Sequence, residues 1–362
     1  MSYLYKNLLK CILLTTLIMQ ASAAFSVETA SKPQTEQHSV AINGGGSAAI
    51  SDLFITWGKS YQARYPDVSM NYKISNVVKG IADLEANKID YAGSEIPLTR
   101  EELKKQGLFQ FPVALISFTP VANLPGIHSG ELRLNDETLA GIFMGTIKRW
   151  NDPRLVAINP KIVLPDAEID TVHRNSGNTI TYALSNYLSK ISPEWAEKVG
   201  VGSTINWPIG KEVGKGSNED MMAYIKGTPY SIGFTFLSLV LKNSLNLVKM
   251  KNKDGFFVGA GPACVMAAAS NAKWNAEDGF YNILTNQAGA DTWPFVMTNY
   301  AMVKLNPASQ LNSKTLIHFF DSKLKRGEIE VVSVDLVPLP PPVVEIILAA
   351  IKEQNLSGQK VK

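Results

Sequence analysis

The chain has 362 residues, of which 35 are Lys or Arg and 32 are Asp or Glu, and its formal net charge is +3. This near balance of charge, without a clustered basic face, argues against nucleic acid as a partner. The length is sufficient for two domains with a substantial hydrophobic core.

The first 23 residues have the pattern of a secretory signal. Lys6 and Lys10 precede an apolar run over residues 11–19 that is too short to span a bilayer, and Ala21-Ser22-Ala23 is a cleavage motif. We therefore expect cleavage near Ala23 and a periplasmic or secreted protein. Loss of Lys6 and Lys10 would leave 33 basic residues against 32 acidic ones. Cys264 would then be the one cysteine, which excludes an intrachain disulfide. Residues 24–39 are polar and are predicted to form a disordered lead-in.

From Val40 onward, strand patterns alternate with helix patterns, which is typical of an α/β fold. The expected strands are 40–43, 69–74, 89–93, 112–124, 169–174, 231–236, 246–250 and 296–304. The expected helices are 48–65, 77–86, 136–143, 177–190, 217–226, 264–272, 276–287, 311–325 and 342–354.

The apolar run Phe111–Leu124 is too long for one ordinary strand. Ser117 and Pro120 in its middle suggest a strand that leaves one lobe and enters another, because proline cannot donate to a central ladder. Trp293–Val303 would be the return crossing. Two crossings predict a discontinuous lobe I, 40–116 plus 297–362, and a lobe II of 117–296, with a cleft between the lobes for a small ligand.

Arg174 lies where an expected strand meets an expected helix, within the segment Thr171–Thr179. We expect Ser176 to cap that helix. A guanidinium beside a helix N-terminus favours an anion, because the unpaired N–H groups, the helix dipole and the cation all attract negative charge. A surface arginine beside a capped helix would show the same pattern, so this segment alone does not decide between the two interpretations.

Two further helix starts have the same character. Gly44, Gly45 and Gly46 precede Ser47 and an amphipathic helix, and successive glycines let the backbone approach a ligand and turn its N–H groups inward. Ser75 follows an expected strand and is predicted to cap the next helix. Each could be an ordinary turn between a strand and a helix. Together with Arg174 they predict an oxyanion site.

Motifs for catalysis are missing from the sequence. There is no HExxH zinc motif, and Gly210-Lys211 lacks the Ser or Thr that follows the lysine of a P-loop. Ser47 fails the last position of the nucleophile-elbow pattern. We expect no metal and no cofactor, and binding in place of catalysis.

Several blocks occur in the same order as in a known family: segments 107–112, 143–152 and 200–210, then Gly216, Trp293-Pro294 and 319–321. On these blocks the chain resembles the periplasmic phosphate-binding subunit of the high-affinity phosphate ABC importer. The resemblance covers about residues 40–352. It implies a two-lobed periplasmic-binding-protein fold of the second structural class, with mixed sheets flanked by helices. It also implies a monomer that is not an enzyme, closes on inorganic phosphate and delivers it to membrane permease subunits.

The resemblance also implies a set of phosphate-binding residues. Glu95 occupies the position of the acid that accepts the phosphate proton, and it would select against sulfate, which has no proton at neutral pH. Arg174 matches the family's arginine. The positions that match the family's anion loops are Gly46, Ser47, Ala48, Ser75, Val77, Asn178 and Thr179.

This sequence departs from the family pattern at several of these positions. Ala48 and Val77 stand where the family has hydroxyl residues, Asn178 replaces a serine and Ile180 a threonine. The acid that would brace Arg174 is also missing. A second hypothesis is therefore a divergent member that binds another oxyanion, or a surface or host partner, and has lost phosphate affinity. A third, an exported phosphohydrolase, lacks a visible metal cluster or activated nucleophile.

Overall fold

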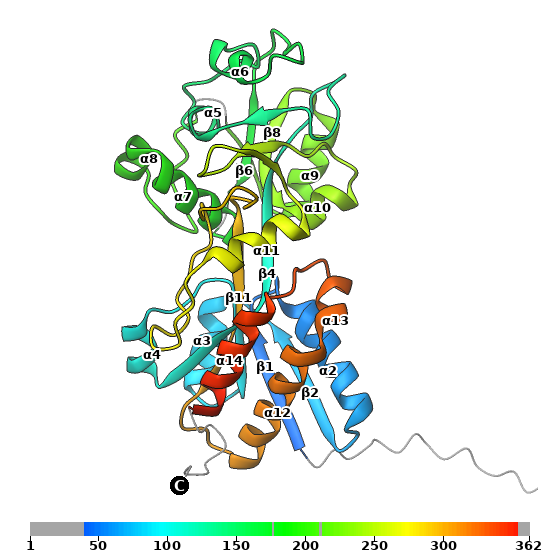
Figure 1. Cartoon of the computed structure of the whole chain (residues 1–362), viewed down its shortest axis with the longest axis vertical. Coiled ribbons are helices and arrows are strands. Elements are labelled where there is room, and N and C mark those ends of the chain that lie inside the picture. The colour runs from blue at the N-terminus through cyan, green and yellow to red at the C-terminus, as the bar shows by residue number, and fades with distance from the viewer. Residues whose placement is uncertain (1–39, 176, 210–211, 354–362) are drawn as a thin grey trace, which may run out of the picture. The chain divides into compact units, whose positions relative to one another are not determined.

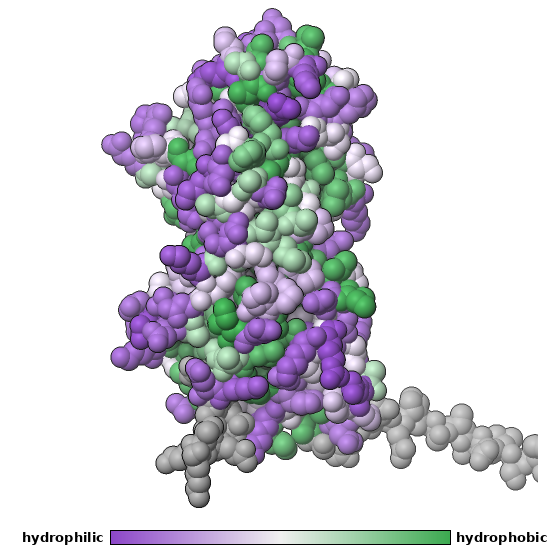
Figure 2. Space-filling model, in the orientation of Figure 1, coloured by the Kyte–Doolittle hydropathy of each residue, from purple (hydrophilic) through white to green (hydrophobic). Residues whose placement is uncertain are grey.

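The computed structural model describes residues 40–175, 177–209 and 212–353. The expected signal peptide, its cleavage site near Ala23 and the lead-in to residue 39 lie outside the described residues. Within the described ranges, no helix is both long and apolar enough to cross a membrane. Hydrophilic residues are spread over the face of the molecule seen in Figure 2.

Eight strands form one mixed sheet in the order β2-β1-β3-β11-β4-β8-β6-β7, and three short strands form a second sheet in the order β10-β9-β5. The large sheet consists of β1 (Val40–Gly46), β2 (Val68–Ile74), β3 (Tyr91–Ser94), β4 (Leu108–Ala122), β6 (Asp170–Arg174), β7 (Glu212–Lys215), β8 (Ser231–Phe236) and β11 (Val296–Lys304). The small sheet consists of β5 (Arg133–Leu134), β9 (Lys249–Lys251) and β10 (Phe257–Gly259).

Strands β4 and β11 join the two halves of the large sheet (Figure 1). The apolar run was expected to be too long for one ordinary strand. It forms a single long strand of 15 residues, β4, which pairs with two different strands along its length. It pairs with β11 from Leu108 to Ser117, and then with β8 from Phe118 to Ala122. Pro120 is accommodated because it lies beyond the part of β4 that pairs with β11. The residues at which one lobe ends and the other begins stay a prediction.

Helices cover the strands of both halves. Their bounds are α2 (Ser51–Arg64), α3 (Val77–Glu85), α4 (Arg100–Gln106), α5 (Asp136–Phe143), α6 (Pro153–Ile158), α7 (Thr179–Ile191), α8 (Pro193–Lys198), α9 (Asn218–Gly227), α10 (Leu237–Lys242), α11 (Pro262–Asn271), α12 (Gln310–Arg326), α13 (Glu328–Ser333) and α14 (Pro341–Glu353). The expected helices 136–143, 311–325 and 342–354 agree with these bounds to within one residue at each end. The short helices α4, α6, α8, α10 and α13 were not predicted.

The expected helix 276–287 is wrong, because this segment forms turns and irregular backbone. Gly279, Phe280 and Asn286 have φ angles of 65°, 55° and 60°, which a right-handed helix cannot contain. The segment is instead fixed by tertiary contacts. The hydroxyl of Tyr300 on β11 donates to the carbonyl oxygens of Phe280 and Asn282, at 3.0 Å each.

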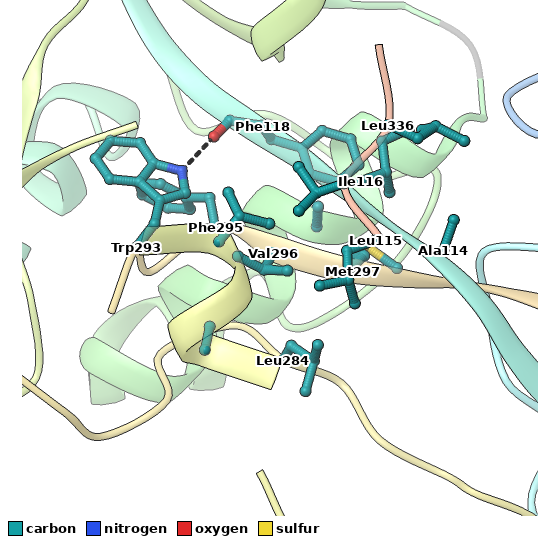
Figure 3. Close-up of a cluster of buried hydrophobic side chains, with 14 of the residues drawn as sticks. Ala114, Leu115, Ile116, Phe118, Leu284, Trp293, Phe295, Val296, Met297 and Leu336 are labelled. Atoms are coloured by element: carbon teal, nitrogen blue, oxygen red, sulfur yellow. Dashed lines mark hydrogen bonds between the residues drawn. The ribbon is translucent and has the colours of Figure 1, made fainter. Parts of the chain in front are cut away.

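A dense apolar cluster surrounds the crossing strands (Figure 3). Trp293 is fully buried just before β11, and its indole N–H donates to the carbonyl oxygen of Phe118 on β4, 2.8 Å away. The Trp293 ring also packs against Phe295, with ring centroids 5.6 Å apart. The two crossings are therefore bound to each other by side-chain packing as well as by the backbone ladder.

Candidate functional site

Glu95 is the most deeply buried acid near the predicted site, and it follows directly after β3 with no exposed surface. Its Oε2 accepts a hydrogen bond from the Thr179 hydroxyl at 3.3 Å, and the Ser47 side chain lies close enough to the carboxyl group to lower its pKa. Its Oε1 is buried and has no hydrogen-bond partner among the described residues. Two predicted site residues, distant in sequence, therefore meet Glu95.

Burial raises the pKa of Glu95 above its ordinary value, because an ionised carboxylate loses its hydration there. The hydrogen bonds from Ser47, from the Glu95 backbone and from Thr179 act in the opposite direction but are weaker. Tyr72 is close enough for the Glu95 charge to help raise the pKa of its phenol, after burial itself. This arrangement allows Glu95 to switch between acceptor and donor at a higher pH than an exposed glutamate.

Gly46 is the last residue of β1, and Ser47 and Ala48 begin the turn that leads to α2. Gly46 has φ of +122°, and a Cβ there would lie 2.5 Å from the carbonyl oxygen of Gly93, so only glycine fits. The need for glycine at this position comes from packing inside the sheet. The Ser47 Oγ accepts from the amide of Ala49 at 3.1 Å, and Ala48 is exposed.

The second predicted loop is capped one residue later than expected. Asn76, and not Ser75, is the N-cap of α3, and its side-chain oxygen accepts from the amide of Lys79 at 2.8 Å. The Ser75 amide instead donates to the carbonyl oxygen of Gly46 at 2.8 Å, which ties the second loop to the first. Val77 is the first residue of α3 and is half-buried. Its side chain has no hydrogen-bonding group.

Arg174 is the last residue of β6, and its guanidinium is held by the turn before α9. It donates to the side-chain oxygen of Asn218, and to the carbonyl oxygen of Gly216 at 2.7 Å. Burial lowers the pKa of Arg174, and the charges of Glu219 and Asp220 oppose that shift. The Asn218 side chain and the Gly216 carbonyl thus orient the cation, and Glu219 and Asp220 add negative charge near it.

A pocket of about 310 Å³ opens beside Arg174. One wall is the imidazole of His173, which stacks on the Trp207 ring with centroids 4.6 Å apart and an interplanar angle of 27°. The pocket is lined by His173, Arg174, Asn175, Thr181, Ser203, Thr204, Ile205, Asn206 and Trp207. Hydroxyl and amide groups next to a cation make this pocket suited to an oxyanion.

The start of α7 connects this pocket to Glu95. Asn178 is the N-cap of α7, where its side chain accepts from the amide of Thr181 at 2.9 Å. The Asn178 amide donates to the carbonyl oxygen of Ser203 at 3.0 Å, while the next residue, Thr179, donates to Glu95. The expected cap, Ser176, lies outside the described residues, and α7 begins later than the expected helix at 177.

Loop 203–207 was not among the predicted site residues, although it lines most of the pocket. In the sequence, this loop could have been singled out only because it lies within segment 200–210, one of the blocks on which the family resemblance rests. A metal site is also missing from the described part of the chain. Among residues 40–175, 177–209 and 212–353, no three His, Cys, Asp or Glu side chains lie close enough together to hold a metal ion.

A Glu95→Gln variant is expected to be more stable than the parent at pH 8, and the difference should shrink toward pH 4. The pKa of Glu95 is raised in the folded state, so its contribution to stability is present below the unfolded value and is lost as the pH rises through the folded value. Gln imitates the neutral form at every pH. Thermal melts in phosphate-free buffer would measure the effect.

The control for this prediction is Glu102→Gln. The pKa of Glu102 is lowered by hydrogen bonds from Thr99 in the capping box of α4, so this variant should lose stability at neutral pH and match the parent at low pH. Parallel melting curves for the parent and Glu95→Gln across the whole pH range would contradict the expected shift.

The fold and the candidate site define a two-lobed ligand-binding protein, and a model described as "PBP superfamily domain" matches residues 28–321. The chain belongs to this superfamily and, within it, to the phosphate-binding protein PstS family. It is 37% identical over 318 residues to the phosphate-binding protein PstS of Xylella fastidiosa (strain 9a5c), a match that covers 88% of this chain and 86% of the relative. It is 36% identical over 317 residues to the phosphate-binding protein PstS of Pasteurella multocida, covering 88% and 91%.

Solved structures agree on the fold. A phosphate-binding protein from Stenotrophomonas maltophilia superposes with a TM-score of 0.61 at 15% identity, covering 85% of this chain and 93% of that one. The expected α/β fold of the periplasmic-binding-protein type is therefore confirmed.

Proposed function

We propose that this protein captures inorganic phosphate between its two lobes and passes it to the membrane permease subunits of an ABC importer. The observation that carries the proposal is buried Glu95, which accepts a hydrogen bond from the Thr179 hydroxyl and lies beside Ser47, while its Oε1 has no partner among the described residues. The named relatives, at 36–37% identity, support the choice of ion. We further propose that the protein acts as a monomer, outside the cytoplasm after signal cleavage, and has no enzymatic activity.

The proposed roles follow from donor and acceptor chemistry. Arg174 supplies the positive charge, and the start of α7, capped by Asn178, brings the Thr179 hydroxyl to Glu95. From the other lobe, the turn after Gly46 and the start of α3 supply backbone N–H groups at Ala48 and Val77, because the amides of Ser47 and Ser75 already donate to the carbonyl oxygens of Gly93 and Gly46. Ser47 and Ser75 would contribute their hydroxyl groups. Ionised Glu95 accepts the proton of hydrogen phosphate and repels sulfate, which has no proton to donate.

Calorimetric titration tests the proposal. The protein is unfolded and refolded in phosphate-free buffer to remove carried-over ligand, and is then titrated with phosphate, arsenate and sulfate. Phosphate is expected to bind at one site per chain and sulfate much more weakly at pH 8. Sulfate should compete better as the pH falls, because Glu95 becomes protonated and can then donate. Glu95→Gln should remove this pH dependence.

A divergent binding role is the second candidate, and Val77 and Ile180 favour it because both are apolar at positions where the family offers hydroxyl groups. Ile180 is buried within α7, so its side chain offers the anion no hydrogen bond. If phosphate produces no saturable heat while another oxyanion binds, phosphate capture is overturned in favour of this candidate.

A further inference from the structure

Asn299 is a fully buried amide in the middle of the return strand β11. Neither its Oδ1 nor its Nδ2 has a hydrogen-bond partner among the described residues. A primary amide carries two donors and an acceptor, and leaving all of them unpaired in a protein interior is costly. Buried polar side chains are normally hydrogen-bonded, so this amide is expected to bond to a polar group of a ligand, since none of the described residues provides a partner.

The register of the sheet places Asn299 at the end of β3 from which Glu95 follows. β11 runs antiparallel to β3, with Val303 paired to Tyr91, Ala301 to Gly93 and Tyr300 to Ser94. β3 ends at Ser94, so Glu95 is the residue directly after its last paired position, and Asn299 is the residue directly beyond Tyr300 on β11. Because side chains alternate between the faces of a sheet, Asn299 lies on the same face as Ala301, the partner of Gly93.

That face is the one turned toward the first anion loop. A Cβ at Gly93 would lie 2.7 Å from the Ile50 side chain, at the turn that leads from Ser47 into α2. The pairing of β11 with β4 also shifts by one residue between Asn299 and Tyr300. The extra residue of this shift is Val113 on β4, and irregularities of this kind are frequent beside functional sites.

Two buried polar side chains, Asn299 on β11 and Glu95 directly after the neighbouring strand β3, therefore lie at the same end of this strand pair. Each has an unsatisfied atom: Glu95 Oε1, and both amide atoms of Asn299. They do not bond to each other. We propose that Asn299 is a further phosphate-binding residue, whose Nδ2 donates to an oxygen of the same ion whose proton Glu95 accepts. This inference rests on the proposed function, because it names the same ion.

Together these two groups would recognise both kinds of oxygen in hydrogen phosphate, the protonated and the unprotonated. Glu95 requires a protonated oxygen, and the Asn299 amide requires an unprotonated one. An ion with both kinds of oxygen satisfies the two side chains at once, whereas sulfate at neutral pH satisfies only the amide. Asn299 would also connect the bound ion directly to the strand that returns from the second lobe.

The test uses two variants of the full chain, Asn299→Leu and Asn299→Asp, titrated with phosphate by calorimetry. Asn299→Leu is close in size and removes both unpaired polar atoms. It should weaken phosphate binding by roughly 10- to 100-fold, the usual worth of a hydrogen bond to a charged group. The same change should raise the melting temperature of the ligand-free protein, because a buried unsatisfied amide has been removed. A merely structural asparagine would give no loss of affinity.

Asn299→Asp keeps the shape of the side chain and replaces the donor with an acceptor. Its loss of affinity should grow as the pH rises, since a second carboxylate then faces the anion. This variant decides the question if Asn299→Leu does not fold. Ser117→Ala is the matched control, because Ser117 is another buried side chain at the crossing whose hydroxyl lacks a partner among the described residues. Its affinity should equal that of the parent.

Phosphate affinity within twofold of the parent in a folded Asn299 variant would overturn the inference while leaving the proposed function intact. An equal loss in Ser117→Ala would overturn it as well, because the effect would then belong to the crossing in general. Failure of the parent protein to bind phosphate would overturn the proposed function, and the role of Asn299 with it.

Discussion

Replacement of Arg174 by alanine is expected to weaken phosphate binding by about 2–4 kcal/mol, because charge-assisted hydrogen bonds are the strongest that the site can offer. The guanidinium is already oriented by Asn218 and Gly216, so little freedom is lost when an anion binds. The measurement is calorimetric titration with phosphate, where this loss corresponds to roughly a 30- to 1,000-fold weaker dissociation constant.

The control for Arg174→Ala is Arg149→Ala, which removes the same charge from an exposed ion pair with Asp166. It should bind phosphate like the parent, because exposed charges are well screened. If Arg174→Ala binds within twofold of the parent, or if both variants lose affinity equally, Arg174 does not contact the ion.

Replacement of Trp293 by alanine is expected to lower the free energy of unfolding by about 3–5 kcal/mol, the usual cost of deleting a large buried aromatic ring. The change leaves a cavity beside Phe295, where the ring packs at the crossing, and leaves the Phe118 carbonyl without its indole donor. Urea denaturation followed by circular dichroism would measure the loss. Trp293→Phe keeps most of the ring and should cost less.

Trp274 provides a matched comparison for Trp293. Its indole also donates to a carbonyl oxygen, that of Ala269 at 2.8 Å, but its ring is only half-buried. Trp274→Ala should therefore destabilise the protein less than Trp293→Ala. An equal loss of unfolding free energy in both variants would show that Trp293 at the crossing contributes no more to stability than a half-buried tryptophan elsewhere.

The elements with strong local patterns were predictable from sequence. The predicted strand 296–304 and helix 136–143 have the observed bounds, because unbroken β-forming and amphipathic runs are flanked there by clear caps such as Asn135. Short elements were missed. Helix α4 has only one buried residue, Leu103, so its stability comes from the capping box of Thr99 and Glu102, which periodicity does not reveal.

The candidate site was predictable only in part. Ser47, Glu95 and Thr179 meet as a group, since each follows a strand or opens a helix at the same edge of the fold. The partners of Arg174 were not predictable, because Gly216 and Asn218 reach it from more than 40 residues further along the chain. The misplaced cap of α3 has a physical cause: Ser75 and Asn76 are equally good caps in isolation, and the hydrogen bond from the Ser75 amide to Gly46 keeps Ser75 with the first loop.

The position of β11 in the sheet has a consequence for how the chain assembles. β3 and β4 follow each other in sequence, yet β11 lies between them, so residues 296–304 must be inserted before either strand has both neighbours. A chain made from its N-terminus therefore holds two incomplete strand edges until most of its length is available. Exposed edges of this kind invite pairing with other chains. The strands of the first half cannot all be paired until residues 296–304 have been made. The time needed to make the intervening residues is therefore the shortest period for which the nascent chain needs protection from aggregation.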